Sequence, residues 1–103
     1  PFSEIINVQN ISTEIPSKYS LSQNYPNPFN PSTVIRFQVT GSSDVMIKVY
    51  DVQGREVQTL VNEKLKAGIY ETTFNGNGLN SGVYFYKLQA GAFTATKKLI
   101  LLK

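Results

Sequence analysis

The sequence predicts an all-β protein, an antiparallel β-sandwich of six to seven strands. Two observations carry this prediction. Val, Ile, Thr, Phe and Tyr, the β-branched and aromatic types that suit a half-buried strand, supply 37 of the 103 residues, whereas only four residues are Ala. Apolar and polar residues also alternate in six segments spaced about ten residues apart, as in sandwiches and barrels. No long window shows the 3.6-residue period of a helix, so we expect negligible helix.

Six segments with this alternation follow one another from Thr33 to the end of the chain. They are Thr33–Val39, Val45–Asp51, Arg55–Val61, Ile69–Phe74, Val83–Ala90 and Phe93–Leu102. The connections are expected at Ser42–Asp44, Gln53–Gly54, a polar loop Asn62–Gly68, the Asn-Gly repeat 75–78 and Ala90–Gly91. The inward-facing residues should form one core: Ile35, Phe37, Val45, Ile47, Val49, Leu60, Phe74, Tyr84, Tyr86 and Leu88.

Residues 1–18 are expected to be a linker from a preceding domain, and residues 19–103 the domain itself. Glu4–Ile11 is a possible seventh strand, but the following Ser-Thr-Glu-Ile-Pro-Ser is typical of a linker. The chain begins without Met and without a basic-then-apolar signal peptide, so we expect it to be a piece of a longer protein.

The segment Ser22–Pro31 contains three of the five prolines of the chain. Proline fixes its own φ and pushes its predecessor into extended geometry, so this segment can be neither a helix nor a central strand. We expect an extended run or consecutive turns, with Tyr25 and Phe29 holding it against the domain.

Leu79 to Tyr84 contains a local signature that narrows the fold. Gly82 lies two residues before Tyr84 at the start of a strand, as in a tyrosine corner, where the hydroxyl group bonds to the backbone a few residues upstream. The alternative is that Tyr84 is simply a core-facing aromatic residue. The corner indicates an immunoglobulin-like sandwich and carries no chemistry of its own.

The composition argues against an enzyme. Without Cys the chain has no disulfide, thiol nucleophile or zinc finger, and without His it lacks the commonest general base and metal ligand. The carboxylates lie mostly at turns and outward strand positions, where solvated charge is the simpler interpretation: Asp44, Asp51, Glu56, Glu63 and Glu71. We expect no catalytic residue, no cofactor and no metal.

The charge is uneven, since Glu71 is the last acidic residue and four lysines follow it. This excess can steer the C-terminal part toward an anionic surface, but solvated lysines that protect strand edges explain it more simply. With only two Arg and no dense basic run, we expect no nucleic acid as partner. No stretch of 18 apolar residues occurs, so we expect no membrane-spanning segment.

Two binding functions remain open at this stage. Asp44, Asp51 and the asparagines of 75–80 offer oxygen ligands for calcium, although turn chemistry alone explains the Asn-Gly repeats. Phe85 and Tyr50 lie out of phase with the core-facing residues of their strands and can form a small platform for carbohydrate.

Four blocks of the chain carry a more specific pattern, in a fixed order. They are Leu21–Phe37 with Asn-Tyr-Pro-Asn-Pro-Phe-Asn-Pro, Val49–Leu60 with Gly54-Arg55, Ser81–Leu88 with Gly-Val-Tyr, and Lys97–Lys103. Over residues 19–103 the sequence closely resembles the C-terminal sorting domain of the type IX secretion system of Bacteroidota. It is also similar to the immunoglobulin-like domain of flagellar hook-capping proteins.

This resemblance implies a non-catalytic address that directs a parent protein through the periplasm and across the outer membrane, to the cell surface or the medium. The implied partners are the outer-membrane secretion machinery, an N-terminal cargo domain and a sortase-like peptidase that cuts within Ile11–Ser20. The alternatives are an accessory carbohydrate-binding module of a secreted hydrolase, and a structural spacer or hook-cap-like assembly domain.

Two features exceed what sandwich stability requires, namely the Pro-rich segment and the basic final strand. We therefore expect the recognition residues to be Asn24, Tyr25, Pro26, Asn27, Pro28, Phe29, Lys97, Lys98 and Lys103. The structural signature residues are Gly54, Leu79, Gly82 and Tyr84.

Overall fold

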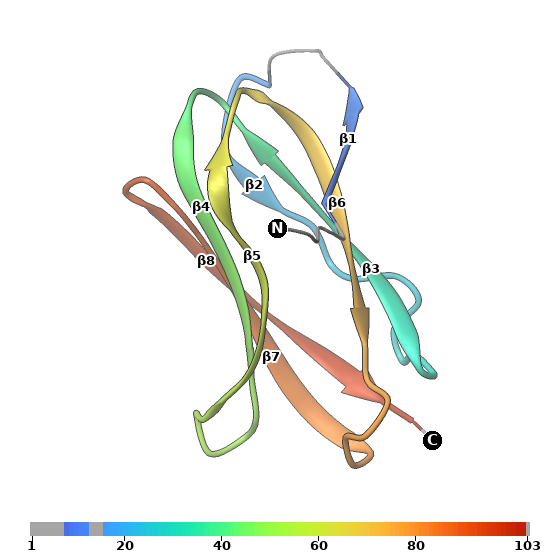
Figure 1. Cartoon of the computed structure of the whole chain (residues 1–103). Helices are drawn as coiled ribbons and strands as arrows, with labels where there is room; N and C mark the ends of the chain where they lie inside the picture. Colours follow the sequence, from blue (N-terminus) through green and yellow to red (C-terminus); the bar gives the residue numbers. More distant parts are fainter. Residues whose placement is uncertain (1–7, 13–15, 103) are drawn as a thin grey trace.

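In the computed structural model, which describes residues 8–12 and 16–102, two four-stranded antiparallel sheets pack face to face (Figure 1). One sheet has the order β1-β6-β3-β2 and the other the order β5-β4-β7-β8. The strands are β1 (Gln9–Ser12), β2 (Ser20–Leu21), β3 (Ser32–Val39), β4 (Ser43–Tyr50), β5 (Glu56–Leu65), β6 (Gly68–Asn75), β7 (Gly82–Ala90) and β8 (Phe93–Leu101). Within the described residues there is no helix, and hence none long and apolar enough to cross a membrane.

The period-2 pattern of the sequence explains how the core forms. Most of the long strands bury every second residue, as β3 does from Thr33 to Val39. β5 differs, because the adjacent Leu60 and Val61 are both buried where its pairing with β4 shifts register. All ten predicted core residues are buried. The core also contains apolar residues outside that list: Leu21, Phe29, Val39, Val61, Leu65, Tyr70, Ala90, Leu99 and Leu101.

Two predicted connections, the one before β4 and the one after β5, are wrong in their bounds. A turn was expected at Ser42–Asp44 and a polar loop at Asn62–Gly68, but β4 begins at Ser43 and β5 continues to Leu65. The antiparallel register pairs Ser43 with Leu65 and Asp44 with Lys64. Backbone pairing with β4 therefore extends β5 beyond its apolar pattern, because outward strand positions tolerate charge.

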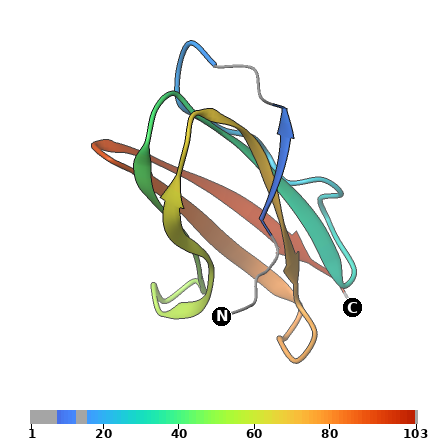
Figure 2. The ribbon, with the colours of Figure 1, turned by 45° about the horizontal axis from the view of Figure 1, so that its top comes forward.

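The structure adds two short strands to the six that the alternation predicted. β2 pairs with β3 through Ser20 and Leu21, and β1 pairs with β6 with a register shift between Asn10 and Ser12. β1 lies inside the segment 1–18 that was expected to be a linker (Figure 2). The first residues of the possible strand Glu4–Ile11 lie outside the described residues.

Two tyrosines make the same hydrogen bond at two of the connections that join the sheets, from β5 to β6 and from β6 to β7. The hydroxyl group of Tyr84 donates to the carbonyl of Asn80 at 2.7 Å, the bond that a tyrosine corner requires. The hydroxyl group of Tyr70 donates to the carbonyl of Lys66, also four residues upstream, at 2.7 Å. This second bond was not predicted, although Gly-Ile-Tyr at 68–70 repeats the spacing of Gly-Val-Tyr at 82–84.

The turn between β4 and β5 explains why Gly54 belongs to the pattern. Gly54 has a φ of 84°, a left-handed conformation that costs glycine little, and its N–H donates to the carbonyl of Asp51 at 3.0 Å. The carboxylate of Asp51 accepts the backbone N–H groups of Arg55 and Gln53. These hydrogen bonds lower the pKa of Asp51, and the bond from the N–H of Arg55 has the largest effect. Leu79, in the connection between β6 and β7, is partly buried and packs against the core.

Candidate recognition surface

The Pro-rich segment, residues 22–31, forms a strap that joins the edges of both sheets. On the first sheet, the N–H of Ser22 donates to Arg36, and Tyr25 and Val34 exchange two backbone hydrogen bonds of 2.9 and 3.0 Å. On the second sheet, the N–H of Phe29 donates to the carbonyl of Ile100 and the carbonyl of Phe29 accepts from Leu102, both at 3.0 Å. The strap therefore brings the two predicted recognition blocks, far apart in sequence, into contact.

Asn24 lies inside the fold and is not available to a partner. It is 2% exposed, and its side-chain amide donates to the hydroxyl group of Thr33 at 2.9 Å and to the carbonyl of Pro26 at 3.2 Å. Its oxygen accepts from Gln23 at 2.7 Å. The amide therefore fixes the path of the strap, as expected of a buried polar group that is satisfied by hydrogen bonds.

The hydroxyl group of Tyr86, a core residue of β7, binds the backbone at the beginning of the strap. Its hydroxyl group donates to the carbonyl of Ser22 at 2.7 Å and accepts the backbone N–H of Asn24 at 2.8 Å. Burial raises the pKa of Tyr86 to about 12, against the opposing effect of the Asn24 N–H. The sequence predicted Tyr86 only as a core residue, because the period-2 pattern places the ring but does not identify the partner of its hydroxyl group.

Phe29 is the second buried residue of the strap. Its ring is 2% exposed and packs edge-to-face on Phe74, with 5.7 Å between the ring centroids. Buried aromatic residues contribute large apolar area, so Phe29 fastens the strap to the core. Of the six recognition residues predicted in the strap, Asn24 and Phe29 thus have structural roles.

The remaining four of these residues are exposed: Tyr25, Pro26, Asn27 and Pro28. Tyr25 is 81% exposed, far more than any other aromatic residue of the core or the strap. Asn27 contributes its side-chain oxygen to the edge of β8, where it accepts the N–H of Ile100 at 3.0 Å. The surface that a partner can reach on the strap is therefore centred on Tyr25 and the two prolines beside it.

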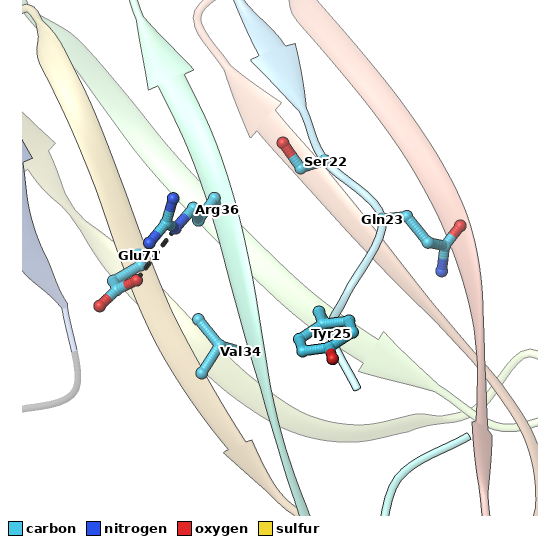
Figure 3. A pocket seen from close by; sticks show the side chains of 6 residues that line it. All are labelled: Ser22, Gln23, Tyr25, Val34, Arg36 and Glu71. Atoms are coloured by element: carbon cyan, nitrogen blue, oxygen red, sulfur yellow. Dashed lines mark hydrogen bonds and ion pairs between the residues drawn. The ribbon is translucent and has the colours of Figure 1, made fainter. Parts of the chain in front are cut away.

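A groove of about 450 Å³ runs beside Tyr25 on the outer face of the first sheet (Figure 3). Tyr25 and Val34 give it an apolar wall, and an ion pair between Arg36 and Glu71, with 3.2 Å between Nε and Oε2, lies at its other side. The Arg36 side chain is 61% exposed, so this ion pair adds little stability. Ser22 and Gln23 complete the lining.

The two adjacent lysines of β8 point to opposite faces of the second sheet. Lys97 shares the inward face with Leu99 and Leu101 and is half-buried, whereas Lys98 is exposed and opposes Phe85 on the outward face. This follows from the alternation of side chains along a strand. The predicted basic strand therefore presents its charges on two faces, and Lys103 lies outside the described residues.

Gln23 belongs to the candidate site although it was not among the predicted recognition residues. Its side-chain amide donates to the carbonyl of Lys98 at 2.7 Å, so it continues the contact between the strap and β8. No local signal could identify this bond, because its two ends are 75 residues apart.

The alternative binding sites have less structural support. Tyr50 and Phe85 are cross-strand neighbours on the outer face of the second sheet, and both are half-buried. Half-buried rings offer a sugar less flat surface than exposed rings would. For calcium, the described residues contain no group of three or more acidic or other metal-ligating side chains.

A comparison with protein families decides the assignment. The family model for the secretion system C-terminal sorting domain matches residues 23–102, which begins in the strap and ends at the last described residue of the chain. The chain belongs to this sorting-domain family. The match confirms the resemblance to the type IX secretion signal that the motif blocks carried. No curated protein and no solved structure matches the chain.

For this sorting domain, the family membership gives the general role of a C-terminal secretion signal. A secretion signal implies export machinery and a cargo as partners, and a destination beyond the outer membrane. The geometry shows which parts of the chain are left exposed on the strap and on β8 for such partners.

Proposed function

We propose that residues 19–103 act as a folded, non-catalytic sorting signal that is recognised through the strap and β8 together. The observation that carries this proposal is the set of hydrogen bonds between the strap and β8, made by Gln23, Asn27 and Phe29, which fastens the strap to β8 on both sides of the exposed Tyr25. A partner can then bind one rigid surface without paying the entropy of ordering a flexible segment.

The proposed route passes through the periplasm and across the outer membrane to the cell surface or the medium. In this proposal the cargo precedes residues 1–18, and a sortase-like peptidase cuts within Ile11–Ser20. That stretch joins β1 to β2, and Ser17 and Lys18 are exposed there. The absence of Cys and His from the sequence supports a signal without catalytic activity of its own.

We also infer that the sandwich is immunoglobulin-like. The sheet order supports this, because β4, β7 and β8 are neighbours as strands C, F and G are in that fold, and β3 pairs with β6 as B pairs with E. The tyrosine corner at Tyr84 stands near the start of the strand that corresponds to F.

The test is export of a reporter in a host that carries a type IX secretion system. An inert periplasmic protein is fused at its C-terminus to residues 19–103, or to residues 1–103, and the fraction outside the cell is measured. We expect both fusions to be exported and the reporter alone to stay in the periplasm. Failure of both fusions contradicts the proposal, whereas export of the longer fusion alone shows that the signal includes β1.

A further inference from the structure

The four edge strands of the two sheets differ in how well they can accept another strand. β1 has four residues and a register shift, β2 has two residues, and the pairing of β5 with β4 shifts register twice. β8 has nine residues and pairs with β7 without a shift from Phe93 to Leu101. Short length and bulges are common ways to block an edge, so among the described strands β8 presents the most regular edge for pairing.

The strap covers only the C-terminal half of this edge. Both backbone groups of Ile100 point away from β7, since its N–H donates to Asn27 and its carbonyl accepts from Phe29. Backbone groups of an antiparallel strand point to the same side at every second residue, so those of Lys98, Thr96 and Thr94 also point outward. Of these groups, the strap contacts only the carbonyl of Lys98.

The open edge is therefore the backbone from Thr94 to Thr96 together with the N–H of Lys98. At its start it is bounded by β2, which lies beside β8, and by Tyr19, whose ring stacks on Phe93 with 5.4 Å between the ring centroids. Within the described part of the chain, no hydrogen bond joins the outward N–H and C=O groups of Thr94 and Thr96 to another residue. The side chains of Thr94 and Thr96 are exposed. Unpaired N–H and C=O groups on a strand edge are a template for pairing, so an added strand can form hydrogen bonds with them.

The charge around the open edge favours one kind of strand. Lys97 and Lys98 flank the edge on its two faces, and the sequence has no acidic residue after Glu71. Pairing β8 with β8 of a second copy would bring four lysines together, and like charges on facing strands are destabilising. The same lysines attract a strand that carries Asp or Glu.

We propose that the open edge of β8 binds an extended acidic segment of the secretion machinery, which adds to the second sheet as a further strand. Main-chain hydrogen bonds supply the affinity in this mode, and the lysines on the two faces supply the selectivity. The strap ends the pairing at Lys98 and so fixes the register of the added strand. This inference rests on the proposed sorting function and specifies how the partner is held.

Thr96→Pro tests the main-chain contact. Proline removes the outward N–H, which takes no part in the described hydrogen bonds of the domain, and its ring obstructs an approaching strand. The full chain is fused behind the reporter, and export and the melting curve of the fusion are measured. We expect an unchanged melting midpoint and a loss of export of about tenfold, the size set by one lost hydrogen bond and the added obstruction.

A charge reversal supplies an independent test, with a matched control on the opposite edge of the same sheet. Lys98→Glu should lower export by about tenfold, whereas Lys64→Glu on β5, also exposed, should export like the parent. If Thr96→Pro has a lower melting midpoint than the parent, the comparison of Lys98→Glu with Lys64→Glu tests the inference in its place.

Export equal to the parent overturns the inference, whether it is found for a folded Thr96→Pro or, if that variant melts early, for Lys98→Glu. Sedimentation of the full chain as a dimer that Thr96→Pro converts to a monomer also overturns it, in favour of a second copy as the occupant. The unsubstituted parent fusion is measured alongside the variants. If it is not exported, the sorting function itself is contradicted.

Discussion

Tyr86→Phe tests whether the strap depends on a single hydroxyl group in the core. In the native domain this group is 0% exposed, donates to Ser22 and accepts the backbone N–H of Asn24. The substitution removes one hydrogen bond outright and leaves the Asn24 N–H without its partner. Net hydrogen bonds are worth about 1 kcal/mol and a buried unsatisfied group costs about 1–3 kcal/mol, so we expect a loss of about 2–3 kcal/mol.

Tyr70→Phe and Tyr84→Phe are matched controls, because each removes the same atom. Their hydroxyl groups only donate, to Lys66 and Asn80, so each variant should lose about 1 kcal/mol. Urea unfolding followed by circular dichroism gives the free energies. In thermal melts a loss of 1 kcal/mol should lower the midpoint by about 4–8 °C for a domain of this size.

We expect Tyr86→Phe to lose more stability than either control. If Tyr86→Phe loses no more stability than the two controls, its hydroxyl group does not hold the strap in the way described. If Tyr84→Phe is as stable as the parent, the corner bond contributes nothing and the corner has no energetic role.

Three further outcomes follow from the strap and β8. Tyr25→Ala should change the unfolding free energy by less than about 0.5 kcal/mol but lower export, since the ring is 81% exposed, whereas Phe29→Ala should cost about 3–5 kcal/mol. The double variant Lys97→Gln/Lys98→Gln should keep its melting curve within about 0.5 kcal/mol and lose export; normal export would assign recognition to the strap instead. Because burial raises the pKa of Tyr86 to about 12, the folded state keeps a proton that the unfolded state loses near pH 10. The unfolding free energy should therefore fall as pH rises from about 10 to about 12, and the fall should be smaller in Tyr86→Phe, as pH-dependent urea titrations of both proteins can show.

The sequence alone determined the parts of the fold that depend on local pattern. The period of two placed Ile35, Phe37 and the other predicted core residues correctly, because a strand buries every second side chain whatever its partner is. The resemblance to the sorting-domain family could also be found from the sequence, because it depends only on the order and spacing of the motif residues. The same alternation already implied that Lys97 and Lys98 face opposite sides, a consequence that grouping them as one basic patch overlooked.

The tertiary structure decided where residues far apart in the sequence meet. The polar sequence Asn62–Lys64 was predicted as a loop, but pairing with β4 made it part of a strand. Asn24 was predicted to face a partner, although Thr33 and Tyr86 bury it, and only the path of the strap brings those partners to it. The contact between the strap and β8 spans more than 70 residues, so no local signal encodes it. Backbone hydrogen bonds have no sequence signature of their own, and for this reason the candidate recognition surface emerged only once both sheets were in place.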